Sequence, residues 1–285
     1  MKILAATDFS TRSNRAVRQA GLLAQPEREP LHLLHVVDDD QPEELVRMET
    51  HEAERLLDEQ ADAMPELRGV ECRPMVVAGS PFDGILRAAK TVDADLIVMG
   101  SHRKKLLRDI FIGTTIERVV RDGTFPILMV NNEAQTKYEN VVAPIDMSDA
   151  SANALRVGLS TGLMVDRRTT LLHAFSPLAK GKMFIGGADQ TSIKDYVASE
   201  RSRCMDELAA FLISRDLMRK QWLYRLDEGD PIDVISNAVS DMRPDLLVMG
   251  THGPSTVLKM LIGSVTETAL RSLNVDILAV PAPKS

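Results

Sequence analysis

Short, almost wholly apolar segments alternate along the chain with longer segments in which apolar residues recur every three or four positions. Segments that are apolar throughout are typical of strands buried in a parallel sheet, and the amphipathic segments between them are typical of helices that cover it. The second half shows the pattern most clearly. There we predict strands at 140–145, 169–175, 221–226, 245–250 and 276–281, and helices at 148–165, 192–216, 231–242 and 265–273.

The chain contains two copies of one unit. ILAATDFS at 3–10 matches VVAPIDMS at 141–148, with Asp8 opposite Asp146, at an offset of 138 residues. Further along, GSPFD matches GDPID and DLIVMG matches DLLVMG at an offset of 150. The second copy therefore holds 12 more residues, which we place at 176–190. Such a duplication predicts two tandem domains of the same fold.

The pattern and the duplication together predict two α/β domains, at 1–132 and 140–285, joined by a polar linker near 131–140. Each would be an open, doubly wound parallel sheet, in which ligands bind beyond the carboxyl ends of the strands where the strand order reverses. The 12 added residues follow the second strand of their domain, at that same edge. A lid over the site and a surface loop without a binding role are both compatible with this position.

Composition narrows the classes of partner. The formal net charge of −7 does not favour a nucleic acid or an anionic membrane as partner. No window approaches 18 apolar residues, and the first residues, MKILAATDFS, resemble a strand rather than a signal peptide, so we expect a cytoplasmic protein. Cys72 and Cys204 stand far apart without metal-binding spacing, and we expect two free thiols.

The motif with most chemical content follows the fourth strand of the second copy. Gly250, Gly253, Gly263 and Ser264 form the pattern G-x2-G-x9-G-S. A glycine at the strand exit permits a positive φ and a close approach to a ligand, and the free N–H groups that begin the last helix suit a phosphate. Ser264 to Glu267 also fits a capping box. From spacing alone, phosphate binding and a purely structural role, in which these residues only end the strand and start the helix, stay equal alternatives.

These residues carry a resemblance to a known family. The Asp that ends the first strand, LLH in the second, and VMGTHG followed nine residues later by GSV resemble the universal stress protein family, over both halves of the chain. The resemblance implies Rossmann-like five-stranded parallel sheets of order 3-2-1-4-5, with the two halves paired through their last strands as an intramolecular pseudo-dimer. Homodimerisation of whole chains stays open.

Many family members with this motif bind ATP, so the resemblance implies a regulatory stress-response protein that binds an adenine nucleotide in its second half. A divalent cation such as Mg²⁺ would bridge the phosphates, and the sequence shows no dedicated cluster of metal ligands. The resemblance implies that the base and ribose contact the residues of the binding set up to Gly250, and that the phosphates contact those from Gly253 onward. That set is Pro144, Ile145, Asp146, Ala174, Met249, Gly250, His252, Gly253, Gly263, Ser264 and Val265.

The first half departs from the motif. Arg103 stands where the second half has Gly253, and Lys104 and Lys105 follow it. Because a glycine at a phosphate turn meets a backbone requirement that added charge does not replace, we expect the first half to have lost the site. The opposite interpretation is that these cations hold phosphates more tightly.

Two other functions remain alternatives. Slow ATP hydrolysis would rest on His252, Lys259 or Ser264, whose spacing does not compel it. A scaffold protein that binds a different ligand, or no nucleotide, is the other alternative. His35 and His173 lie inside apolar strands, where we expect core histidines with satisfied hydrogen bonds.

Overall fold

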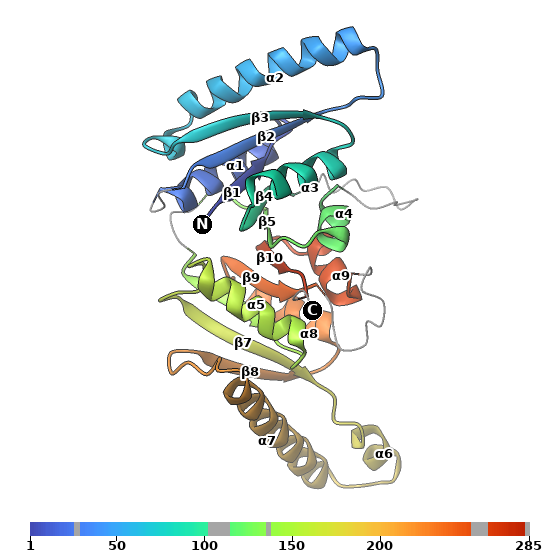
Figure 1. Ribbon diagram of the computed structural model, residues 1–285. Helices are drawn as coiled ribbons and strands as arrows, with labels where there is room; N and C mark the ends of the chain where they lie inside the picture. Colours follow the sequence, from blue (N-terminus) through green and yellow to red (C-terminus); the bar gives the residue numbers. More distant parts are fainter. Residues whose placement is uncertain (26–28, 102–114, 135–137, 252–261, 283–285) are drawn as a thin grey trace.

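The computed structural model describes residues 1–25, 29–101, 115–134, 138–251 and 262–282. Its strands form one ten-stranded sheet, in the order β3-β2-β1-β4-β5-β10-β9-β6-β7-β8 (Figure 1). The strands of the first half are β1 (Ile3–Ala6), β2 (Leu31–Val37), β3 (Cys72–Ala78), β4 (Leu96–Gly100) and β5 (Ile127–Val130). Those of the second half are β6 (Asn140–Pro144), β7 (Arg168–Phe175), β8 (Leu223–Glu228), β9 (Leu246–Gly250) and β10 (Asp276–Val280).

Each half has the strand order 3-2-1-4-5 that the resemblance implies, and all pairs within a half are parallel. The halves meet where β5 pairs with β10, the one antiparallel pair among the described strands, with Leu128 opposite Leu278. This edge-to-edge junction confirms the intramolecular pseudo-dimer. It also covers two strand edges that would otherwise offer unpaired backbone groups to other chains.

Helices cover both faces of the sheet (Figure 1). One face packs against α1 (Thr11–Ala24), α2 (Glu43–Ala63), α5 (Asp149–Ser160) and α7 (Gln190–Ser214). The other packs against α3 (Pro81–Val92), α4 (Thr115–Asp122), α8 (Pro231–Met242) and α9 (Ser264–Ser272). Along β1, Ile3 and Ala5 belong to the first core layer and Leu4 to the second, because successive side chains of a strand point to opposite faces. Each core layer runs through both halves.

The segment between the halves is anchored in the seam. It was expected to be a polar linker, yet Tyr138 is 2% exposed and its hydroxyl donates to Asp276 Oδ2 at 2.8 Å. Asp276 Oδ1 accepts the backbone N–H groups of Asn131 at 2.8 Å and Asn132 at 2.9 Å. A buried carboxylate thus fixes the path by which the chain leaves β5 and enters the second half.

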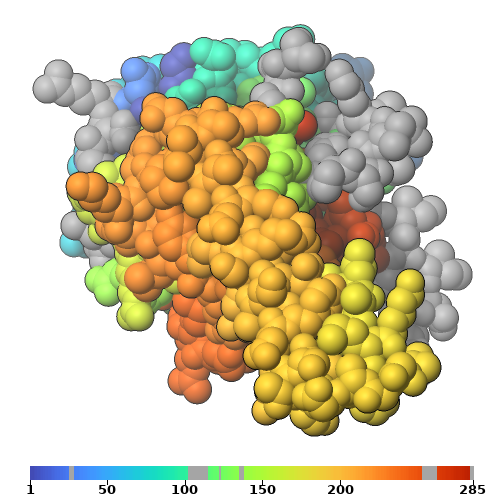
Figure 2. Space-filling model, turned by 90° about the horizontal axis from the view of Figure 1, so that it is seen from below, coloured from blue at the N-terminus to red at the C-terminus, as the bar shows by residue number. Residues whose placement is uncertain are grey.

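The region of the 12 added residues forms a short helix, α6 (Lys180–Ile185), and the start of α7. Leu178 and Ile185 are each 87% exposed and Phe184 is 70% exposed. This part extends from the end of the molecule that carries α7 (Figures 1 and 2). A 3-10 turn, Pro65–Leu67, completes the described elements. Among the described residues, no helix is both long and apolar enough to cross a bilayer.

Candidate functional site: two crevices at the strand ends

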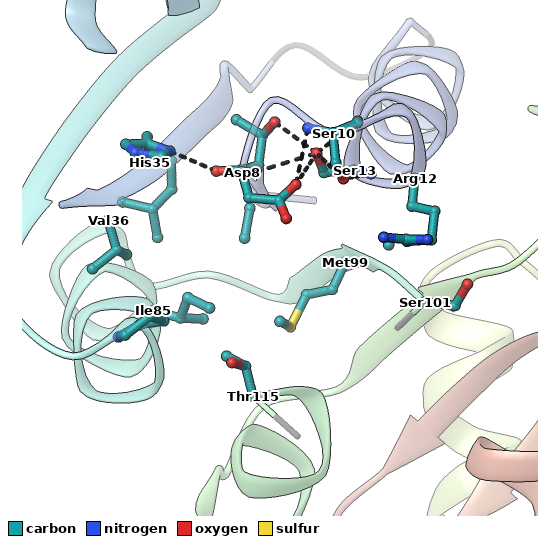
Figure 3. Close-up of a pocket in the computed structure, with 15 residues that line it drawn as sticks. Asp8, Ser10, Arg12, Ser13, His35, Val36, Ile85, Met99, Ser101 and Thr115 are labelled. Atoms are coloured by element: carbon teal, nitrogen blue, oxygen red, sulfur yellow. Dashed lines mark hydrogen bonds between the residues drawn. The ribbon is translucent and has the colours of Figure 1, made fainter. Parts of the chain in front are cut away.

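A cavity of about 220 Å³ opens at the carboxyl ends of β1 and β4 in the first half (Figure 3). β1 and β4 are neighbours in the sheet, but the helices that follow them, α1 and α4, cover opposite faces. This is therefore the switch point at which doubly wound sheets bind ligands. Leu34, Val36, Ile85 and Met99 supply an apolar wall. The second half has the same strand adjacency between β6 and β9, with Val141 opposite Leu246.

Asp8 lies at the centre of the first crevice and is held by its own turn. Its Oδ1 accepts the Ser10 backbone N–H at 3.0 Å and the Ser13 hydroxyl at 2.7 Å. The Thr7 hydroxyl in turn donates to Ser13 Oγ at 3.1 Å. Burial alone would raise the pKa of Asp8, but the hydrogen bonds from Ser10 and Ser13 outweigh it, and the pKa lies below its ordinary value. The crevice therefore presents a carboxylate.

Asp146 occupies the matching position at the end of β6. Its Oδ1 accepts the Ser148 backbone N–H at 3.1 Å and the Ser148 hydroxyl at 2.5 Å. Ile145 is buried, and its N–H donates to Leu172 O at 2.8 Å, which keeps the turn attached to β7. The carboxylate of each half is therefore fixed by a serine two residues later.

His35 and His173 are equivalent in the two halves, and they are not core residues. Each is only partly buried, and His35 lines the cavity (Figure 3). His35 Nδ1 lies 2.9 Å from Thr7 O, and His173 Nδ1 lies 2.7 Å from Ile145 O. The expectation of satisfied hydrogen bonds is confirmed, but the expected core position is wrong. Each ring ties β2 or β7 to the turn that carries the aspartate.

Gly250 is a glycine for a reason other than the expected freedom of φ. Neither Gly250 nor its counterpart Gly100 takes a positive φ. A Cβ on Gly250 would lie 2.8 Å from the Ala150 carbonyl oxygen, and one on Gly100 would lie 2.6 Å from the Arg12 carbonyl oxygen. Because real Cβ atoms do not approach backbone so closely, any side chain here would push the first helix of its half away from the strand end.

The start of α9 is fixed beside the end of β9. The Gly263 N–H donates to Thr251 O at 2.7 Å, and the Thr266 hydroxyl donates to Gly250 O at 2.8 Å. Gly263 is the N-cap, and among the described residues no side chain caps the helix, so the alternative of a capping box with Ser264 as N-cap is not observed there. Within the described ranges, the first N–H groups of α9 thus have no side-chain acceptor, which suits an anionic ligand.

The structure brings most of the predicted nucleotide-binding residues of the second half to one edge. Asp146, Gly250, Gly263 and Ser264 lie at the ends of β6 and β9 or the start of α9, and Val265 follows in the first turn of α9. Met249 is 3% exposed and packs in the core layer. Other residues singled out from the sequence lie outside the described residues: Arg103, Lys104, Lys105, His252, Gly253 and Lys259. Within the described ranges, no three His, Cys, Asp or Glu side chains form a metal-binding group.

Comparison with known proteins decides the family. The model of the universal stress protein family matches twice, over residues 1–131 and 137–281. The chain belongs to the universal stress protein family. Universal stress protein MJ0577 of Methanocaldococcus jannaschii is 25% identical over 154 residues, covering 46% of this chain and 95% of its own. The universal stress protein A homolog of Haemophilus ducreyi is 29% identical over 147 residues, covering 50% of this chain and 96% of its own.

A solved structure covers both halves of this universal stress protein together. The crystal structure of a universal stress protein from Archaeoglobus fulgidus has a TM-score of 0.68, with 19% identity, and covers 99% of this chain and 98% of its own. At that identity the likeness establishes the fold alone. It matches the mixed α/β architecture and the tandem arrangement described above.

Sequence reasoning missed part of the first crevice in this universal stress protein. Arg12, Ser13, Ser101 and Thr115 line the cavity together with Asp8. The signal was present in the internal alignment, because Arg12 falls opposite Ala150 at the offset of 138. Besides the glycine motif, the two crevices therefore differ at this position in the first turn of a helix.

Proposed function

We propose that this universal stress protein binds ATP in the crevice of its second half and acts as a nucleotide-dependent regulator in a stress response. Asp146 would accept hydrogen bonds from the ribose hydroxyls. Pro144, Ile145 and Ala174 would line the base. Membership of the family supports an adenine nucleotide as ligand. The pattern of Gly250, Gly253, Gly263 and Ser264 resembles the motif with which many family members bind ATP.

The observation that carries the proposal is the start of α9. Its first N–H groups have no side-chain cap in the part of the chain that the structure describes. The bonds from Gly263 to Thr251 and from Thr266 to Gly250 hold them at the strand edge that carries Asp146. Aligned peptide dipoles place a partial positive charge there, which stabilises a phosphate by about 0.3–1 kcal/mol at an exposed site and more where water is excluded. Helix starts of this kind are common phosphate sites.

A divalent cation would be held mainly by the phosphates and by water. Mg²⁺ usually keeps several water ligands and takes only one or two protein carboxylates together with phosphate oxygens. The absence of a three-ligand group in the described part of the chain fits that mode of binding. Asp146, which follows β6, is one carboxylate at this edge that could take part in holding the cation.

Substitution of Gly263 by alanine tests the proposal at a position where the backbone conformation accepts a side chain. Gly263 has φ −62° and ψ 138°, a conformation open to any residue, so a methyl group costs the backbone little. We expect ATP to raise the melting temperature of the wild type. Most of this rise should be lost in Gly263→Ala, because the methyl group blocks close approach of phosphate. Gly181→Ala is the matched control, since no atom lies within 4 Å of the added Cβ. An equal ATP response in all three proteins would refute the assignment.

A further inference from the structure

Arg12 sets the first crevice apart from the second. It is the second residue of α1, and Ala150 occupies its place in α5. Its side chain reaches from α1 toward the end of β4, where Ser101 lies (Figure 3). The Arg12 backbone is packed against Gly100, whose absent Cβ would be 2.6 Å from Arg12 O. The guanidinium therefore leaves from a fixed point at the rim of the cavity.

Within the parts of the chain that the structure describes, the Arg12 guanidinium has no partner, because its side chain forms neither a hydrogen bond nor an ion pair there. The positive end of the helix dipole repels the guanidinium of Arg12, and the first turn of α1 holds no acidic residue that would offset this repulsion. The second half differs, because Asp149 in the first turn of α5 pairs with Arg215. An anionic ligand would supply the partner that the first crevice lacks.

Asp8 offers the complementary group to the same ligand. The hydrogen bonds from Ser10 and Ser13 both end on Oδ1, which leaves Oδ2 to accept from a ligand hydroxyl. The lowered pKa keeps this carboxyl ionised and therefore an acceptor. The carboxylate of Asp8, which can accept from hydroxyl groups, and the guanidinium of Arg12, which can bind an anion, thus line the same cavity (Figure 3).

The size of the cavity favours a compact ligand. Its volume of about 220 Å³ lies below the range of roughly 300–1,000 Å³ that is common for small-molecule pockets. Val36 lines the apolar side of this cavity, and its side chain is larger than that of Ala174, its counterpart in the second half. A ligand with one phosphate fits these limits better than a nucleoside triphosphate.

We propose that the crevice of the first half binds a compact phosphate monoester that carries free hydroxyl groups, either a sugar phosphate or a nucleoside monophosphate. The phosphate pairs with Arg12, whose planar guanidinium can donate two parallel hydrogen bonds to phosphate oxygens. A ligand hydroxyl donates to Asp8. This site is separate from the ATP site proposed for the second half, and the two crevices then differ in the ligand that each selects.

Calorimetric titrations of the Asp146→Ala protein, in which the second crevice is impaired, test the proposal. The probes are ribose 5-phosphate, adenosine 5′-monophosphate and adenosine, each on the Asp146→Ala background and with Arg12→Ala or Arg12→Gln added. Arg18→Ala is the matched control, because Arg18 is an exposed cation on the same helix and does not line the cavity. We expect both phosphate esters to bind about 10–100-fold more weakly without Arg12, with adenosine unaffected.

The two esters distinguish the source of the phosphate. Tighter binding of the nucleotide identifies a nucleoside monophosphate, and equal or tighter binding of ribose 5-phosphate identifies a sugar phosphate. Failure of both esters to bind, or equal affinities with and without Arg12, would overturn the proposal. ATP binding by the wild type is measured in a separate titration, so a failure of the second-half site is recognised independently.

Discussion

A Cβ added to Gly84 in α3 would lie 2.7 Å from Cγ1 of Val36 in β2. The second half has Ala174 at the position of Val36 and Val234 at the position of Gly84. The larger and the smaller side chain have therefore changed places between strand and helix. The exchange changes the pair by only one methyl group, from valine and glycine to alanine and valine. It gives each crevice a different wall, with a valine beside the cavity of the first half.

This relationship predicts the stability of a pair of substitutions. Gly84→Val should destabilise the protein by about 1–3 kcal/mol, because the rigid valine of β2 cannot move away from the new side chain. Adding Val36→Ala should recover part of that loss, since the double variant has the same alanine and valine pair as Ala174 and Val234 in the second half. Urea unfolding of the two single variants and the double variant gives the coupling energy. Additive effects would show that the two positions do not share one space.

Arg271 and Glu117 connect the halves on the face that carries α4 and α9. Arg271 Nε lies 2.6 Å from Glu117 Oε1, and a second nitrogen lies 3.1 Å from Oε2, while Glu117 is only 8% exposed. Arg271→Ala should cost about 1–3 kcal/mol, because it removes a bidentate partner from a buried carboxylate. Arg156→Ala, at an exposed position on α5, is the control and should cost less than about 0.5 kcal/mol. Equal costs in thermal or urea unfolding would mean that the ion pair does not stabilise the seam.

Tyr138 should stabilise the seam through its hydroxyl as well as its ring. Tyr138→Phe keeps the buried ring and removes the hydrogen bond to Asp276, so we expect a loss of about 1–3 kcal/mol in urea unfolding. Tyr224→Phe is a useful comparison, because the Tyr224 hydroxyl contacts only Met218 Sδ among the described residues, at 3.2 Å. A Tyr138→Phe protein as stable as the wild type would contradict a structural role for this bond.

Asp276 should make stability depend on pH. Burial raises the pKa of Asp276 above its ordinary value, and the hydrogen bonds from Asn132, Asn131 and Tyr138 offset this only in part. Between the unfolded and folded pKa values the folded state binds more protons, so this group's contribution to stability falls as pH rises through that window.

Comparison with Asp276→Asn isolates this contribution. The stability of the wild type minus that of the variant should be largest near pH 4 and should decline as the pH rises through the folded pKa. Urea unfolding of both proteins at a series of pH values measures this difference. A difference that grows with pH would show that the hydrogen bonds, rather than burial, dominate at this carboxyl.

Periodicity and duplication were enough to predict two tandem, doubly wound α/β domains, but not their strand order. Helix α8 spans Pro231–Met242 as predicted, and the strand order 3-2-1-4-5 followed from the resemblance. Strand β8 begins at Leu223 rather than 221, because an edge strand has one free side and its apolar pattern marks its ends weakly. The buried place of Tyr138 could not be read locally, since its partner Asp276 lies 138 residues further along the chain.

The candidate site was only partly predictable for the same reason. Asp146, Gly250 and Gly263 occur at element ends that the hydrophobic pattern locates. The role of Gly250 depends on how closely α5 approaches β9, a tertiary distance that spacing does not contain. The same holds for Arg12, whose position at the cavity depends on the contact between α1 and Gly100.

Calorimetric titration with ATP of the wild type, Asp146→Ala and Asp8→Ala tests the central claim most directly. The two variants remove equivalent carboxylates from the two crevices, so they differ only in which half is impaired. We predict one ATP per chain in the wild type, lost in Asp146→Ala and retained in Asp8→Ala. Two equivalent ATP sites, or binding that survives Asp146→Ala and disappears in Asp8→Ala, would contradict the assignment of ATP to the second half.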